Sequence, residues 1–72
     1  MTNVTLLRQK IDDSGLKMSF IAEQLNMTPQ GLYKKLKDGS DWLFSQVMII
    51  KKFLQLSDEE VNIIFFNDDD VE

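Results

Sequence analysis

The part of the sequence with the clearest potential for chemistry is residues 28–37, TPQGLYKKLK, where hydroxyl, amide and ammonium groups recur at helical spacing. Thr28 is a favourable N-cap, and Pro29 suits the first helical position because its φ is already helical and it has no N–H to satisfy. The amide of Gln30 and the ammonium of Lys34 are groups that pair with adenine and guanine edges in the major groove. This helix therefore has the chemistry expected of a reader of duplex DNA.

A preceding helix is expected to position this one. Residues 18–25 form a short helical segment, and Asn26 and Met27 then make a tight turn. Ala22 is small enough to let two helices approach closely where they cross. The apolar seam at helical spacing consists of Ile21, Leu25, Met27, Leu32 and Leu36. Residues 18–37 are therefore predicted to be a helix-turn-helix, with the second helix as the recognition element.

The predicted DNA-contacting residues lie on this second helix and its N-cap, and they are Thr28, Pro29, Gln30, Tyr33, Lys34, Lys35 and Lys37. Pro29 offers an apolar contact, whereas Thr28, Lys35 and Lys37 suit phosphate oxygens, which position a protein without reading sequence. Two alternatives stay open: the lysines could form an ordinary solvated helix face, and Tyr33 could pack against Trp42. We favour DNA contact, because three cations lie on this element and none on the expected last helix.

The net charge of −4 is unusual for a DNA-binding protein, but the distribution of the charge fits one. Residues 1–37 carry six cations and three acids, whereas residues 38–72 carry two cations and nine acids. The two parts therefore differ in sign, +3 against −7, and the positive part contains the predicted recognition element.

Residues 1–67 are expected to form one compact all-α domain. Apolar residues at helical spacing predict five helices, at about residues 3–14, 17–25, 29–37, 46–55 and 58–65. Gly15 suits the position just past the first helix, and Ser45 is expected to cap the fourth. Ser57 and Glu60 have the S-x-x-E spacing of a capping box at the start of the fifth.

The last two predicted helices contain more apolar residues than a small core can bury. Between Trp42 and Phe66, fifteen of twenty-five residues are large and apolar. The surplus is expected at the surface, where it would mark a partner interface. The expected interface residues are Met48, Ile49, Phe53, Ile63, Phe65 and Phe66. The occupant could be a second copy that pairs two DNA half-sites, a repressor protein, or a terminal segment that folds back.

Composition excludes several functional classes. The chain has no His and no Cys, which rules out zinc sites, disulfides and catalysis by a thiol or an imidazole. No nucleophile–base pair or Gly-rich phosphate loop is present, so we expect no enzyme and no cofactor. The acidic tail, residues 68–72, lacks the spacing of a calcium loop and is expected to be frayed and solvated. Without a signal peptide or an apolar run near the ~20 residues of a membrane span, we expect an intracellular protein with no membrane partner.

The order of five short helices, with IAEQLNMTPQGLYKKL in the second and third, resembles the lambda-repressor-like Cro/C1-type (XRE) helix-turn-helix family over roughly residues 3–66. The segments DDSGLKMSFIAEQLN and VNIIFFN are similar to those of small temperate-phage regulators of Gram-positive hosts, a group that includes Cro-type repressors and modulator-of-repression proteins. The resemblance implies a transcription regulator of the lysis–lysogeny switch that binds an operator in the host cytoplasm. An alternative is an antirepressor or antitoxin-like module that sequesters a repressor through its apolar C-terminal half.

The sequence departs from the family pattern at two places. Asn26 stands where the turn usually holds Gly, although Asn tolerates the left-handed conformation required there. Lys17 and Met18 stand where Thr or Gln usually opens the first helix of the motif. The side chain of Met18 cannot hydrogen-bond a phosphate, so the usual backbone contact at that position lacks its side-chain donor.

Overall fold

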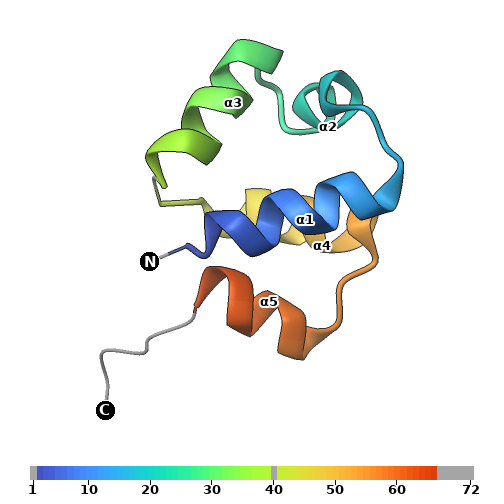
Figure 1. Cartoon of the computed structure of the whole chain (residues 1–72), viewed down its shortest axis with the longest axis vertical. Coiled ribbons are helices and arrows are strands. Elements are labelled where there is room, and N and C mark those ends of the chain that lie inside the picture. The colour runs from blue at the N-terminus through green and yellow to red at the C-terminus, as the bar shows by residue number, and fades with distance from the viewer. Residues whose placement is uncertain (1, 40, 67–72) are drawn as a thin grey trace.

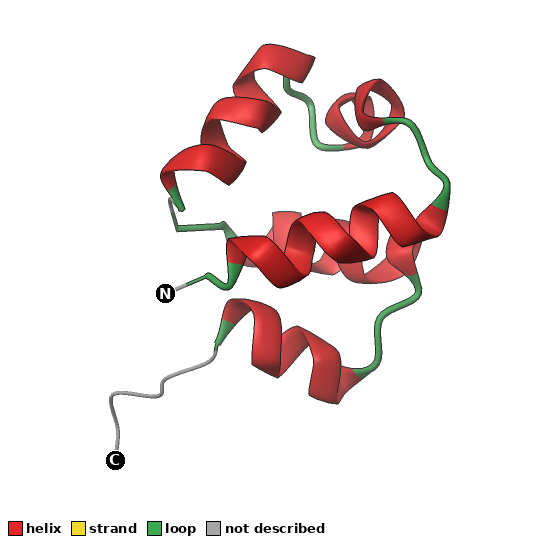
Figure 2. Cartoon of the chain, in the orientation of Figure 1, coloured by secondary structure: helices red, strands yellow, loops and turns green. Residues whose placement is uncertain are grey.

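The computed structural model describes residues 2–39 and 41–66, which form five α-helices and no strand (Figures 1 and 2). The helices are α1 (Val4–Ser14), α2 (Met18–Gln24), α3 (Pro29–Asp38), α4 (Phe44–Leu54) and α5 (Asp58–Phe65). The predicted all-α, five-helix architecture is confirmed. Ser40, in the predicted turn after α3, and the predicted acidic tail at residues 68–72 lie outside the described residues.

The ends of α1 and α3 follow from capping chemistry. Asn3 Oδ1 accepts a hydrogen bond from the Leu6 N–H (3.1 Å), and Thr28 Oγ1 accepts one from the Gly31 N–H (3.0 Å). Gly15, just past α1, has φ +75°, a left-handed conformation that glycine adopts without a Cβ clash. The predicted cap at Thr28 and the predicted end of the first helix at Gly15 are therefore confirmed.

The fourth helix begins earlier than the sequence predicts. The expected N-cap was Ser45, but Leu43 occupies that position and the Gln46 Oε1 accepts a hydrogen bond from the Leu43 N–H (2.9 Å). A side-chain amide three residues into the helix thus satisfies a backbone donor at its start. The predicted capping box of α5 is confirmed, with Ser57 and Glu60 bonded reciprocally at 2.8 and 3.1 Å.

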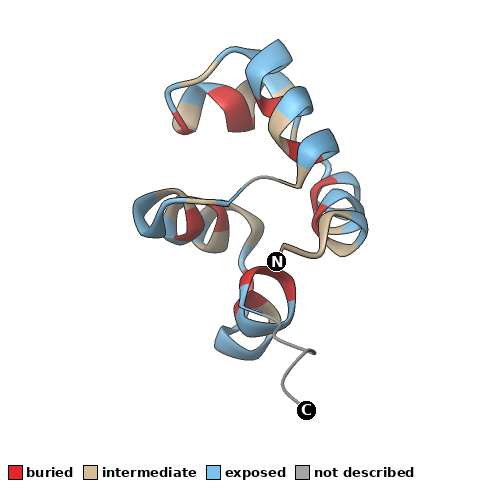
Figure 3. Ribbon diagram, turned by 90° about the vertical axis from the view of Figure 1, so that its left-hand side faces the viewer, coloured by how far each residue is buried: buried red, intermediate tan, exposed pale blue. Residues whose placement is uncertain are grey.

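One stripe from each helix contributes to a single core, and no buried residue of the described chain is polar or charged. Figure 3 shows the buried segments facing the space that the helices enclose. The core residues are Leu7, Ile11, Ile21, Ala22, Leu25, Leu32, Leu36, Val47, Ile50, Leu56, Val61, Ile64 and Phe65. Each large side chain contributes roughly 1.5–3 kcal/mol by burial, which favours this arrangement of the helices.

The central helix of the arrangement is α1, which separates α3 from α5 along the long axis of the molecule (Figure 1). The Asn3 N–H donates a hydrogen bond to the Ile64 carbonyl (2.7 Å), and Lys10 Nζ lies 2.6 Å from Glu60 Oε2. These two contacts show that α1 and α5 run antiparallel. Because α1 lies between α3 and α5, the outer sides of these two helices lie at opposite ends of the molecule (Figure 1).

No helix within residues 2–39 and 41–66 combines the length and the apolar character needed to cross a membrane.

Candidate nucleic-acid interface

The connection between α2 and α3 is a tight turn with one residue in a left-handed conformation. Asn26 has φ +58°, as expected for a residue type that tolerates this region. The Met27 N–H donates a hydrogen bond to the Ala22 carbonyl (2.9 Å), which closes the turn onto the end of α2. Ala22 itself is fully buried, so its small side chain permits the close packing of α2 and α3.

The recognition element predicted from sequence, α3, has a buried face and an exposed face. Leu32 and Leu36 are buried and anchor the helix in the core. Six of the predicted DNA-contacting residues are exposed: Thr28, Pro29, Gln30, Tyr33, Lys34 and Lys37. Helical spacing places Gln30, Lys34 and Lys37 on the same side of α3, opposite the buried stripe. The structure thus brings an amide and two ammonium groups together on one solvent-facing surface.

The seventh predicted residue, Lys35, is held within the protein. Its Nζ donates a hydrogen bond to the Asp41 carbonyl and lies 4.9 Å from the centroid of the Trp42 ring. The side chain is half-buried, whereas Lys34 and Lys37 are exposed. Binding of a phosphate by Lys35 would require these internal contacts to be given up.

Tyr33 contacts a residue that the sequence did not single out. The guanidinium of Arg8, on α1, lies 5.6 Å from the centroid of the Tyr33 ring. Trp42, the alternative neighbour considered for Tyr33, instead makes an edge-on contact with Phe65 at 5.9 Å between ring centroids. No local pattern signals the pairing of Arg8 with Tyr33, because the two residues lie on helices that meet only in the tertiary structure.

Gly31 is the third residue of α3 and approaches the cap of its own helix. A methyl group at this position would lie 3.2 Å from Thr28 Oγ1, closer than ordinary van der Waals contact. The absence of a side chain therefore leaves room for the hydroxyl that caps α3.

Apolar residues are exposed on α4 and α5, but their identity differs from the prediction. Met48, Ile63 and Phe66 are exposed as expected, and Leu43 and Phe44 are still more exposed, at 67% and 70%. We call these five residues the apolar surface. Leu43 and Phe44 were missed because the expected cap at Ser45 placed both of them before the helix.

Three residues of the predicted interface are wholly or partly buried. Phe65 is only 7% exposed and packs against Trp42, so the expectation that it lies at the surface is wrong. Phe53 is half-buried and contacts Phe20 of α2 edge-on, with ring centroids 5.4 Å apart. Ile49 is half-buried and packs against the core. The side of α4 that carries Phe53 therefore faces α2.

The opposite flank of α4 carries Phe44 and Met48. Phe44 lies two turns before Lys51 and Met48 one turn before it, so all three share one flank of α4. Lys51 forms an ion pair with Asp58 at the start of α5. Phe44 and Met48 therefore lie on the side of α4 that borders α5. Phe66, directly after α5, adds a further exposed ring at 54% exposure.

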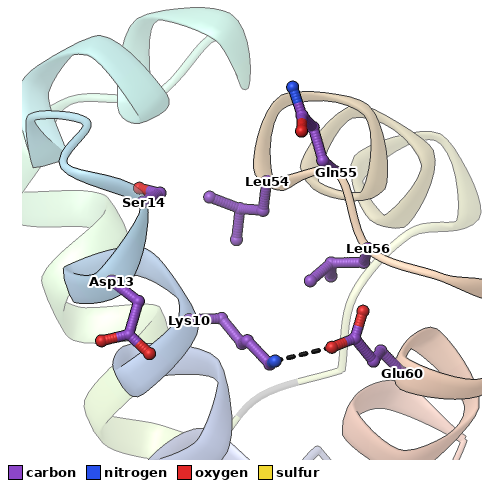
Figure 4. A pocket seen from close by; sticks show the side chains of 7 residues that line it. All are labelled: Lys10, Asp13, Ser14, Leu54, Gln55, Leu56 and Glu60. Atoms are coloured by element: carbon purple, nitrogen blue, oxygen red, sulfur yellow. Dashed lines mark hydrogen bonds and ion pairs between the residues drawn. The ribbon is translucent and has the colours of Figure 1, made fainter.

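A small hollow lies between the C-terminal end of α1 and the connection from α4 to α5 (Figure 4). Its volume is about 220 Å³, below the roughly 300–1,000 Å³ of typical small-molecule sites. The lining residues are Lys10, Asp13, Ser14, Leu54, Gln55, Leu56 and Glu60. The ammonium of Lys10 and the carboxylate of Glu60 pair with each other across it. Within the described chain, no three His, Cys, Asp or Glu side chains gather as a metal site would require.

Comparisons with known protein families, with curated proteins and with solved structures find no match to this chain.

Proposed function

We propose that this protein is a sequence-specific regulator of transcription that binds double-stranded DNA, with α2 and α3 acting as a helix-turn-helix and α3 entering the major groove. The resemblance to Cro/C1-type domains favours a lambda-repressor-like fold and a role in a temperate-phage switch. The observation that carries the proposal is the exposed side of α3, where Gln30, Lys34 and Lys37 lie together.

These three side chains suit base and phosphate contacts. Among the described residues, no hydrogen bond or ion pair occupies the polar ends of Gln30, Lys34 and Lys37, whereas Lys35 on the same helix is engaged. An α-helix is about 10–12 Å in diameter and therefore fits a major groove about 12 Å wide, and the ten residues of α3 extend about 15 Å along it. Thr28 Oγ1 accepts the capping hydrogen bond, and its own O–H remains able to donate to a phosphate.

The position of the charges also supports this role. The acids of α5 begin that helix, and α5 lies at the end of the molecule away from α3 (Figure 1). A net negative protein can therefore present a locally positive helix to DNA, because exposed charges are largely screened beyond roughly 8–10 Å at physiological salt.

The test is selection of binding sites from a library of random duplexes, followed by affinity measurements on the enriched site. The parent protein is expected to enrich one site and to bind it with a steep dependence on salt. Lys34→Ala and Gln30→Ala should each lower affinity for that site by about 1–3 kcal/mol and relax the preference at one base pair. Lys52→Ala, which removes an exposed lysine from α4, is the matched control and should bind as the parent does. Failure to enrich any site would contradict sequence-specific binding.

The apolar surface supports a second candidate, a module that acts by binding another protein such as a repressor. Phe44 and Phe66 expose aromatic rings at 70% and 54%, and exposed apolar residues that gather in one patch mark a partner surface. Because neither Phe44 nor Phe66 belongs to α3, this activity is compatible with DNA binding in the same protein. A second copy of the chain would use the same side chains.

Sedimentation of the protein alone and with a candidate repressor protein tests this candidate. Phe44→Asp should weaken whichever complex forms, because it would bury a carboxylate in an apolar contact. Ser45→Asp is the control, since it adds the same charge to the first turn of α4 next to the apolar surface. Complexes equally sensitive to both substitutions, or to neither, would argue against this surface.

A further inference from the structure

A cation from outside α3 lies beside the exposed side of that helix. The guanidinium carbon of Arg8 is 5.6 Å from the centroid of the Tyr33 ring, and both side chains are exposed. Arg8 belongs to α1, next to the buried Leu7, and it is the only arginine of the chain. Helical spacing directs Arg8 and Lys10 to opposite flanks of α1, so that Lys10 reaches α5 and Arg8 reaches α3.

The register of α1 and α3 brings Arg8 close to the lysines of the proposed DNA interface. A methyl group at Gly39 would lie 3.7 Å from Val4 Cγ2, and Arg8 contacts Tyr33, so the two helices run antiparallel along their shared contact. Tyr33 and Lys37 are one turn apart on α3, or about 6 Å along its axis. Arg8 therefore lies at the α1 edge of the exposed side of α3.

The way Arg8 is held leaves its hydrogen-bonding groups available. Contact of a guanidinium with an aromatic ring uses the charge of the group and fixes its position, but it uses none of its five N–H donors. Among the described residues, the carboxylates that form ion pairs are Glu60 and Asp58, and their partners are lysines. The donor fork of an arginine matches two phosphate oxygens.

We propose that Arg8 is a phosphate-binding residue of the DNA interface and that Tyr33 is the residue that positions it. This inference rests on the proposed function and extends the interface from α3 to α1. It assigns Arg8 to the DNA backbone, so its contribution is independent of base sequence.

The experiment measures the affinity for a short duplex of arbitrary sequence over a range of salt concentrations. Each phosphate contact contributes about 0.9 to the slope of log affinity against log salt concentration. Arg8→Gln should therefore lower the steepness of this slope by about 0.9. Tyr33→Leu should also lower it in the parent background, but it should have little further effect on the slope when combined with Arg8→Gln.

Lys52→Gln is the matched control. The ammonium of Lys52 also lies 5.6 Å from an aromatic ring, that of Phe53, and the substitution removes the same charge from α4. It should leave the slope as in the parent. Circular dichroism of each variant shows whether the helical fold and its stability are retained.

The outcomes separate this inference from the proposed function. Salt-dependent binding by the parent with an unchanged slope in Arg8→Gln would overturn the role of Arg8 and leave DNA binding intact. Loss of stability in Arg8→Gln with an unchanged slope would show that the contact with Tyr33 only joins two helices, which also overturns it. A parent protein without salt-dependent binding of any duplex would overturn both proposals.

Discussion

The ammonium of Lys35 lies 4.9 Å from the centroid of the Trp42 ring, and it donates a hydrogen bond to the carbonyl of Asp41, the residue before Trp42. Trp42 in turn contacts Phe65 edge-on. A continuous series of contacts therefore joins α3 to α5 through the segment that precedes α4. Two neighbouring lysines of α3 consequently differ, because Lys35 is held inside this series and Lys34 faces solvent.

Replacement of each lysine by methionine should separate these roles. Lys35→Met is expected to lower the free energy of unfolding by about 1–2 kcal/mol, because it removes a charged hydrogen bond and a cation–π contact. Lys34→Met should change it by no more than about 0.5 kcal/mol, as is usual for an exposed site. Urea unfolding followed by far-ultraviolet circular dichroism measures both values. Equal effects of the two substitutions would contradict the structural role of Lys35.

Truncation of the adjacent phenylalanines at the end of α5 should lower stability by very different amounts. Phe65 is 7% exposed and Phe66 is 54% exposed. Phe65→Ala is expected to cost about 3–5 kcal/mol, since it leaves a cavity beside Trp42. Phe66→Ala should cost less than about 1 kcal/mol. Thermal and urea unfolding of both variants measures this difference, and a larger loss in Phe66→Ala would reverse our assignment of core and surface.

Stability should decline in acid because two carboxylates are paired in the folded state. The hydrogen bond from Lys10, followed by the one from the Ser57 N–H, lowers the pKa of Glu60 below its ordinary 4.5. The hydrogen bond and charge of Lys51 lower the pKa of Asp58 below 3.8. A carboxyl group whose pKa is lowered by folding stabilises the folded state at pH values above its ordinary pKa. This stabilisation is lost as the pH falls through the pKa of the folded state.

The acid dependence should therefore begin near pH 4.5 and continue below it. Glu60→Gln is expected to make the free energy of unfolding less dependent on pH in this range. Glu59→Gln, at the exposed neighbouring position, is the control and should retain the dependence. Urea midpoints measured at a series of pH values give the comparison, and identical curves for the parent and Glu60→Gln would contradict a contribution from this pair.

Among residues 2–39 and 41–66, two residues other than glycine occupy the left-handed region of backbone conformation, Asn26 at φ +58° and Gln55 at φ +55°. A left-handed conformation costs most L-residues about 1–2 kcal/mol, whereas Asn offsets part of this cost. Gln55→Gly should therefore raise the free energy of unfolding by about 0.5–1 kcal/mol, after the entropy cost of glycine in the unfolded chain. Asn26→Gly should have a smaller effect. Calorimetric melting of both variants compares the two gains in stability. A larger gain in Asn26→Gly than in Gln55→Gly would contradict this prediction.

Much of the secondary structure was predictable, because helix starts and ends depend on partners a few residues away. Thr28 caps α3 through the Gly31 N–H, and Ser57 and Glu60 bond each other across three residues. The start of α4 is an error of the prediction, because the side-chain amide oxygen of Gln46 accepts a hydrogen bond from the Leu43 N–H and the helix begins before Ser45. That one error also removed Leu43 and Phe44 from the predicted apolar surface.

The sequence by itself determined the five helices, the left-handed turn at Asn26 and the polar character of the exposed side of α3, since each of these depends on local capping and on helical spacing. Only the tertiary structure decided that Phe65 is buried and Phe66 exposed, that Lys35 is held by the segment before α4, and that Arg8 lies beside Tyr33. The physical reason is that these contacts join residues of different elements of the fold. Which side chains meet there depends on the packing of all five helices around the core and cannot be read from the periodicity of any one of them.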